Sequence, residues 1–91
     1  MQHLIAYDIA CPRRLQKAHH YLSQYAIPLQ NSVFLHIGSH EQAQQCFADL
    51  TNILHPKQDN LRFYSLPNHT LIHTLGKTAL PAGVILGGFN L

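Results

Sequence analysis

The stretch HLIAYDI, residues 3–9, is a nearly continuous apolar run with an acidic residue near its end. Such a run is typical of a central β-strand that is covered on both faces. Pro12 follows shortly afterwards, and proline is favoured in the first turn of a helix. The segment therefore predicts a buried strand that leads through a short loop into a helix.

The helix predicted after Pro12 carries apolar and aromatic side chains at helical spacing on one face. We expect this inner face to consist of Leu15, Ala18, His19, Leu22 and Tyr25. Pro28 is expected to end the helix, because proline disrupts helical hydrogen bonding.

The remaining segments predict further β-strands and a second helix. The segment LQNSVFLHI, residues 29–37, is read either as one bent strand or as a tight pair about Asn31 and Ser32, and we favour the pair. Ser39 and Gln42 have the spacing of a capping box, which predicts a second helix. Its apolar stripe consists of Ala43, Cys46, Phe47, Leu50, Ile53 and Leu54. The segment NLRFYSL, residues 60–66, predicts the next strand.

This order of elements predicts an α+β, ferredoxin-like βαββαβ fold with an antiparallel sheet. We expect residues 1–76 to form that domain, with HTLIHTL, residues 69–75, as an added edge strand. Both helices would cover one sheet face, so a second copy of the chain is expected to cover the other. The result would be a homodimer packed sheet to sheet. The tail, residues 77–91, is expected to dock on the dimer or on another protein.

Composition narrows the class of protein further. A chain of 91 residues with 46% hydrophobic residues can build one small core, and two domains are excluded. The formal net charge of +2 is too low to indicate nucleic-acid binding by itself. Cys11 and Cys46 form no CxxC pair, which favours a reduced, cytoplasmic setting without structural zinc. No apolar run approaches the roughly 20 residues of a membrane span, so we expect no membrane association.

Four pieces of the chain together resemble a known family. They are YDI at residues 7–9, PRRLQK at residues 12–17, QNSVF at residues 30–34 and LRFYSL at residues 61–66. In this order they are similar to the CRISPR-associated "Cas-two" family over about residues 3–75. The resemblance implies a ferredoxin-like homodimer with both copies of Asp8 near the dyad. It also implies metal-dependent endonuclease activity on RNA or DNA, and a scaffold role between integrase subunits during spacer acquisition.

Asp8 is the main candidate for chemistry, since a carboxylate at the end of an apolar strand needs a compensating partner. Two copies related by a dimer axis could hold one hydrated Mg²⁺ or Mn²⁺, which prefer oxygen ligands. Alternatively, Asp8 accepts backbone N–H groups at the start of the following helix. The YDI context favours the metal hypothesis. Tyr7 is a candidate catalytic neighbour that could stack or hydrogen-bond near Asp8.

Arg13, Arg14 and Lys17 cluster in the first turns of the first predicted helix and are candidate contacts to DNA or RNA phosphates. A solvated helix face is the alternative. Ser32 either lines the site or is a turn hydroxyl. For Phe34 there are three interpretations: contact with a base, contact with the opposite sheet, or a place in the core. The eight histidines lack a spacing that favours a transition-metal site.

These observations support two compatible hypotheses and one rival. The first is a dimeric adaptation subunit that binds nucleic-acid backbone and an integrase, and the second is a metal-dependent endonuclease. The rival is a ferredoxin-like regulatory module or toxin-type ribonuclease without a CRISPR role. The low net charge favours the rival, and so does the segment Ile27, Pro28 and Leu29, where many relatives of the resembled family carry a basic residue.

Overall fold

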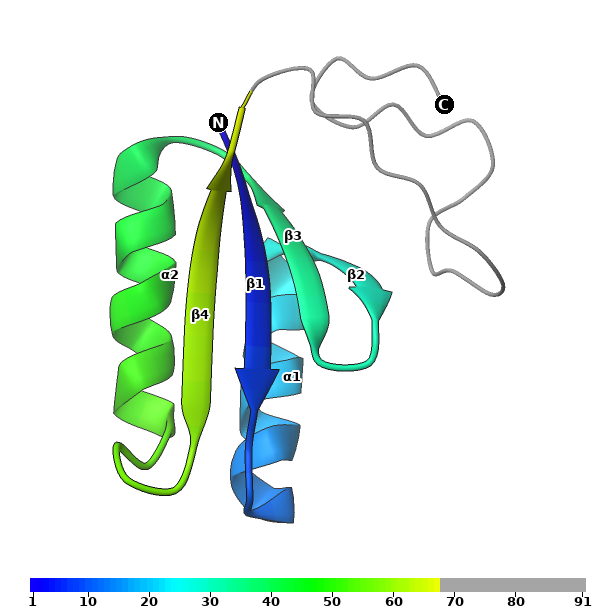
Figure 1. Ribbon diagram of the computed structural model, residues 1–91, viewed down its shortest axis with the longest axis vertical. Helices are drawn as coiled ribbons and strands as arrows, with labels where there is room; N and C mark the ends of the chain where they lie inside the picture. The colour runs from blue at the N-terminus through cyan, green and yellow to red at the C-terminus, as the bar shows by residue number, and fades with distance from the viewer. Residues whose placement is uncertain (68–91) are drawn as a thin grey trace.

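The computed structural model describes residues 1–67 of the chain. The elements in order are β1 (Gln2–Asp8), α1 (Pro12–Tyr25), β2 (Ile27–Gln30), β3 (Val33–Ile37), α2 (His40–Ile53) and β4 (Asn60–Leu66) (Figure 1). The strands form one sheet in the order β2-β3-β1-β4, and all neighbours are antiparallel. This confirms the α+β, βαββαβ prediction and the strand pair. The predicted edge strand at 69–75 and the tail at 77–91 lie outside the described residues.

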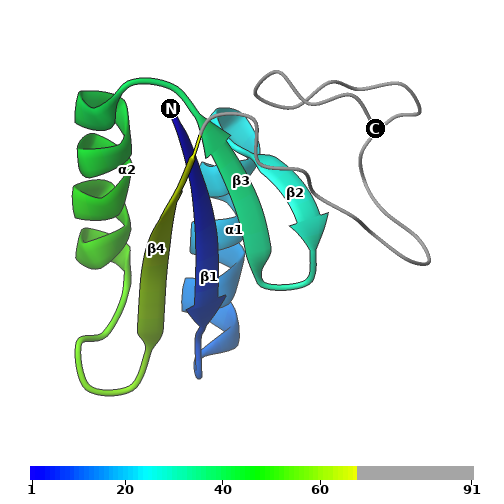
Figure 2. The ribbon, with the colours of Figure 1, turned by 45° about the horizontal axis from the view of Figure 1, so that its top comes forward.

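Both helices lie on the same face of the sheet (Figures 1 and 2). The core between them and the sheet is built around Ile5 of β1 and Phe34 of β3, which are paired in the strand register. Leu22 of α1 and Leu50 of α2 close over them, and neither side chain is exposed. The apolar run of β1 therefore becomes the central strand, as predicted.

The face that α1 turns inward differs from the predicted one. Ala18 and Leu22 are buried, but Leu15 is 39% exposed and Tyr25 is 57% exposed. Tyr21, absent from the predicted face, packs against the core, and its hydroxyl donates to Asp49 Oδ2 on α2 at 2.6 Å. The prediction is confirmed for Ala18 and Leu22 and wrong for Leu15 and Tyr25, because α1 turns toward α2 as well as toward the sheet.

Proline marks both limits of α1. Pro12 occupies the first turn, as predicted, and the helix ends at Tyr25. The residue before a proline avoids helical geometry, so Ile27 is already extended and begins β2. Pro28 therefore lies inside β2 and not before it. A proline is tolerated there because β2 is an edge strand.

The predicted capping box starts α2. Gln42 N donates to Ser39 Oγ at 3.1 Å, and Ser39 N donates to Gln42 Oε1 at 2.8 Å. Most of the predicted stripe packs inward as expected. The exception is Phe47, which is 40% exposed and lies edge-on to Phe63 of β4, with ring centroids 5.1 Å apart.

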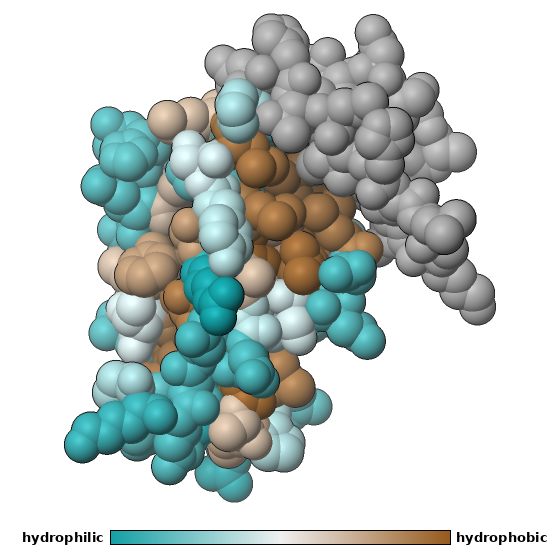
Figure 3. Space-filling view, in the orientation of Figure 1, coloured by the Kyte–Doolittle hydropathy of each residue, from teal (hydrophilic) through white to brown (hydrophobic). Residues whose placement is uncertain are grey.

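The sheet face opposite the helices, here called the open face, carries a second apolar cluster. It is built on the buried side chains of Leu29 and Leu35, with Leu4, Ile27, Val33 and Leu66 packed against them. Figure 3 shows apolar side chains over the upper part of β1 and β3, and polar ones at the lower end of the sheet. No helix within residues 1–67 covers this face. Because Leu29 and Leu35 are only 7% and 0% exposed, the predicted second copy of the chain would pack on the partly buried members of this cluster.

Candidate functional site

Asp8 is the last residue of β1 and is exposed. Its register partner on β4 is Asn60, and the two residues line a shallow depression of about 270 Å³ at the polar end of the open face. Within residues 1–67, the Asp8 carboxylate has no hydrogen bond or ion pair. The nearby Arg62 guanidinium donates instead to Asn60 Oδ1 at 3.0 Å and to the Tyr64 hydroxyl at 3.4 Å. No cation among residues 1–67 pairs with Asp8, which can therefore meet a cation from elsewhere.

The alternative role for Asp8, as an acceptor at the start of the helix, is taken by another residue. The N-cap of α1 is Cys11, which makes no side-chain capping bond. The preceding amide, Ala10 N–H, donates to Asp59 Oδ1 at 3.0 Å. The structure therefore contradicts the N–H acceptor hypothesis for Asp8.

Asp59 precedes β4 and joins three segments of the chain. Besides Ala10 N–H, it accepts from His55 N–H at 2.8 Å, from Arg14 Nε at 2.7 Å and from Arg14 Nη2 at 3.1 Å. The bond from Arg14 is the main reason that the pKa of Asp59 lies well below its usual range. Sequence analysis missed Asp59, although an aspartate that follows a Pro-containing turn often accepts backbone N–H groups.

Tyr7 and Asp8 point to opposite faces of the sheet, because successive side chains of a strand alternate. The Tyr7 ring is only 7% exposed and stacks on Phe34, with ring centroids 6.2 Å apart. The structure therefore does not bring the Tyr7 side chain to Asp8. Phe34 is 1% exposed, which confirms its assignment to the core and leaves it no surface to meet a base.

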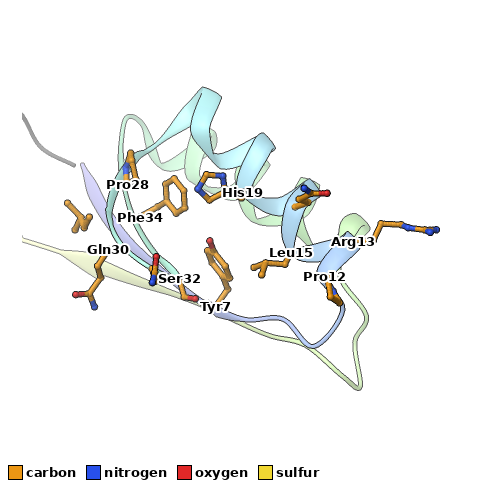
Figure 4. Close-up of a pocket in the computed structure, with 12 residues that line it drawn as sticks. Tyr7, Pro12, Arg13, Leu15, His19, Pro28, Gln30, Ser32 and Phe34 are labelled. Atoms are coloured by element: carbon orange, nitrogen blue, oxygen red, sulfur yellow. The ribbon is translucent and has the colours of Figure 1, made fainter. Parts of the chain in front are cut away.

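Ser32 lies in the turn between β2 and β3 and has a φ of 66°. Its carbonyl oxygen accepts a hydrogen bond from Tyr7 N–H at 3.1 Å, so the turn is fixed against β1. Ser32 also lines a cleft between the β2–β3 hairpin and α1, with a volume of about 1090 Å³ (Figure 4). Tyr7 and Phe34 form part of the same lining.

The three basic residues that were predicted to contact phosphates differ in their surroundings. Arg13 and Lys17 are exposed, and within residues 1–67 neither forms an ion pair. They line one shallow depression on the outer side of α1, together with His20. Arg14 turns the other way and forms the ion pair with Asp59. Arg13 and Lys17 are therefore the available cations of α1, whereas the charge of Arg14 is already compensated.

His3 and His36 form a buried pair that sequence analysis did not identify. They are register partners on β1 and β3, with ring centroids 6.2 Å apart. Both side chains are more than nine-tenths buried, and each Nδ1 has no hydrogen-bond partner within residues 1–67. Burial is the main cause that lowers the pKa of both imidazoles. We missed the pair because the sequence suggested comparison of His36 with His40, its neighbour along the chain.

The acidic residues limit what metal site one chain can form. All four acids of the sequence lie within residues 1–67. Asp59 and Asp49 are hydrogen-bonded within the fold, and Glu41 lies in the first turn of α2. In this part of the chain no group of three His, Cys, Asp or Glu side chains could hold a metal ion. One Asp8 carboxylate alone is a poor site for Mg²⁺ or Mn²⁺, and a site with two Asp8 carboxylates needs a second chain.

The fold and its exposed groups define a class: a small α+β domain with an antiparallel sheet, a carboxylate at the end of β1 and cations on α1 that have no ion-pair partner among residues 1–67. Neither helix among the described residues is long and apolar enough to cross a membrane. Two solved structures share this fold. One is Cas2 of Streptococcus pyogenes, with 30% identity, a TM-score of 0.75 and coverage of 84% of this chain and 100% of that one. The other is the hypothetical protein TT1823 of Thermus thermophilus, with 28% identity, a TM-score of 0.78 and coverage of 88% and 95%.

Sequence comparison identifies the family. The family model "CRISPR associated protein Cas2" matches residues 1–72, and the chain belongs to the Cas2 family. A relative from Nitrosomonas europaea, named CRISPR-associated endoribonuclease Cas2 1, is 42% identical over 93% of this chain and 81% of its own. A relative from Thermodesulfovibrio yellowstonii, named CRISPR-associated endoribonuclease Cas2 2, is 29% identical over 92% and 93%. The family assignment does not fit the rival hypothesis of a module without a CRISPR role.

Proposed function

We propose that this chain is a homodimeric subunit of CRISPR spacer acquisition that binds nucleic-acid backbone while an integrase subunit holds it. The observation that carries the proposal is the pair Arg13 and Lys17. They are exposed one helical turn apart on α1, and neither forms an ion pair within residues 1–67. Two such faces on one dimer would offer separate contacts to a phosphate backbone, which supplies most of the affinity in sequence-independent binding.

The dimer is supported by the open face. Its apolar cluster around Leu29 and Leu35 extends to partly buried neighbours, and no helix within residues 1–67 covers it. Contiguous apolar surfaces of this kind mark interfaces. We propose that two open faces pack together about a two-fold axis, so that each copy presents Asp8 to the same region.

Salt dependence tests the nucleic-acid interface. We expect the variant with Arg13→Gln and Lys17→Gln to bind duplex DNA more weakly whatever its sequence. Each lost phosphate contact should flatten the slope of log affinity against log salt by about 0.9. The control is Lys57→Gln, which removes an exposed cation from the loop before β4 and should change the slope less. Equal effects of both variants would indicate diffuse charge attraction and contradict a specific face on α1.

We also propose a metal-dependent endoribonuclease activity, because the exposed Asp8 carboxylate is unpaired within residues 1–67 and curated relatives are named endoribonucleases. Paired Asp8 side chains would hold Mg²⁺ or Mn²⁺, and the metal would supply an activated water or steady a phosphate. Asp8→Asn should then abolish RNA cleavage while the dimer persists. Glu41→Gln, on the helix side, is the matched control and should retain cleavage. Cleavage by purified Asp8→Asn at the wild-type rate would exclude this site.

A further inference from the structure

The cleft between α1 and the β2–β3 hairpin, here called the hairpin cleft, has no role in the functions proposed above. Its volume is about 1090 Å³. Tyr7 lines it, whereas Asp8, whose side chain lies on the opposite face of the sheet, does not. It is lined by Tyr7, Pro12, Arg13, Leu15, Gln16, His19, Pro28, Leu29, Gln30, Asn31, Ser32 and Phe34.

The hydroxyl of the largely buried Tyr7 side chain reaches into this cleft. The Tyr7 side chain is 7% exposed, and within residues 1–67 its hydroxyl makes no hydrogen bond. Figure 4 shows the hydroxyl directed into the space bounded by Leu15, His19 and Phe34. Burial raises the pKa of Tyr7, so the group stays protonated and can donate. The Tyr7 oxygen is not one of the sealed polar atoms of residues 1–67, so a ligand in the cleft can reach the hydroxyl and accept its hydrogen bond.

The lining suits a flat, polar molecule. Leu15 is 39% exposed, and it lines the cleft together with the imidazole of His19 on α1 and Pro28 on the hairpin. Such surfaces accept the face of a planar ring. Around them lie groups that donate and accept hydrogen bonds, namely Gln16, Gln30, Asn31 and Ser32. This is the combination that recognises the edges of a nucleobase.

The charge of the residues that line the hairpin cleft also favours a nucleotide. None of the chain's four acids lines the hairpin cleft. Arg13 stands at the end where α1 begins, and its side chain extends outward (Figure 4). Arg13 also lines the depression that holds Lys17, so the proposed backbone-binding face continues directly into the cleft.

We propose that the hairpin cleft holds one unpaired nucleotide of a bound strand. Its base contacts Leu15 and His19 and hydrogen-bonds to the Tyr7 hydroxyl, and Arg13 binds its phosphate. This inference rests on the proposed nucleic-acid function and deepens it. A duplex with a single-stranded extension would therefore bind more tightly than a blunt duplex of the same length.

The test compares these two duplexes by fluorescence anisotropy at fixed salt concentration. Tyr7→Phe removes only the unpartnered hydroxyl and keeps the ring that stacks on Phe34. We expect this variant to bind the extended duplex about five-fold more weakly, the effect of one hydrogen bond, with unchanged affinity for the blunt duplex. Tyr25→Phe, whose ring is 57% exposed outside the cleft, is the control and should match the wild type. Leu15→Trp, which fills the cleft without changing charge, should also remove the advantage of the extended duplex.

A second experiment distinguishes an incorrect nucleotide site from an incorrect proposed function. Nucleoside monophosphates are titrated into ¹⁵N-labelled protein, and the amide signals of Tyr7 and Ser32 are followed by NMR. We expect shifts in the wild type that weaken in Tyr7→Phe, and none with ribose 5-phosphate. Amide shifts with nucleoside monophosphates but no binding of either duplex would support the nucleotide site and contradict the proposed binding of nucleic-acid backbone. Blunt-duplex binding without these shifts, or equal shifts with ribose 5-phosphate, would overturn the hairpin cleft as a nucleotide site.

Discussion

Arg14 Nε donates to Asp59 Oδ2 at 2.7 Å, and this ion pair joins the first turn of α1 to the loop before β4. The Asp59 side chain is only 1% exposed. Both of its oxygens also accept backbone N–H groups, from Ala10 and His55. The Asp59 carboxylate thus joins the loop between β1 and α1 to the loop that leads into β4.

We expect Asp59→Asn to lower the thermal midpoint of unfolding by several degrees. Asparagine loses the charge that pairs with Arg14 and presents an N–H₂ donor where acceptors are needed, and a donor that loses its acceptor in this part-buried pair costs stability. Glu41→Gln, in the first turn of α2, is the control and should change the midpoint less. The comparison is made by circular dichroism at pH 7. Equal midpoints for Asp59→Asn and the wild type would show that the carboxylate is not needed for stability.

Stability should also fall as the pH drops below about 6.5, because of His3 and His36. Burial lowers the pKa of each imidazole from 6.5, and for His36 the neighbouring His3 and the N-terminal ammonium add to the effect. The unfolded chain therefore takes up protons that the folded chain does not, so the free energy of unfolding decreases below that pH. The lowered pKa of Asp59 acts in a separate window, since its stabilisation is lost only as the pH falls below about 3.8.

Thermal midpoints measured between pH 7.5 and pH 5 check the histidine effect. The variant with His3→Leu and His36→Leu should show a flatter pH profile than the wild type, whatever its midpoint at pH 7.5. The control is His20→Gln, which changes an exposed imidazole on α1 and should keep the wild-type profile. An equally steep profile in the double leucine variant would assign the pH dependence to other groups.

The sequence predicted those elements whose signals are local. The apolar run of β1 and the capping box of Ser39 and Gln42 each lie within a few residues, and the structure confirms both. The inner face of α1 was predicted only in part, since Tyr21 turns inward and bonds to Asp49 on another helix. No spacing along α1 indicates where that second helix will pack.

The candidate site was predictable only in part for a similar reason. Asp8 and Arg13 were identified from their positions at the ends of local elements. By contrast, Arg14 and Asp59 are 45 positions apart, and their ion pair exists only when the β1–α1 and α2–β4 loops meet at one end of the sheet. The pair of His3 and His36 likewise depends on strand register, which a single sequence does not specify.

The two cysteines should differ sharply in reactivity. Cys11 lies at the N-cap of α1, where the nearby backbone N–H groups of Arg14 and Arg13 lower the pKa of its thiol. Cys46 is 2% exposed, and burial raises its pKa. Because the thiolate is the reactive form, Ellman's reagent at pH 7 should label one thiol quickly and the second only after unfolding. Cys11→Ser should remove the fast phase, and two fast phases in the folded wild type would contradict the burial of Cys46.

Dimerisation through the open face can be tested with two substitutions of similar exposure on opposite faces. Tyr64 is 45% exposed, and its register partner Leu4 belongs to the open-face cluster, whereas Phe47 is 40% exposed on the helix side. A lysine introduced at an apolar interface places an unpaired charge there, and the charge must be desolvated when the chains associate. We therefore expect Tyr64→Lys to reduce the molar mass in solution from two chains to one, as measured by light scattering after gel filtration, and Phe47→Lys to remain dimeric. A monomeric wild type, or a dimer that only Phe47→Lys disrupts, would exclude the open face as the interface and leave the two Asp8 carboxylates without a shared site.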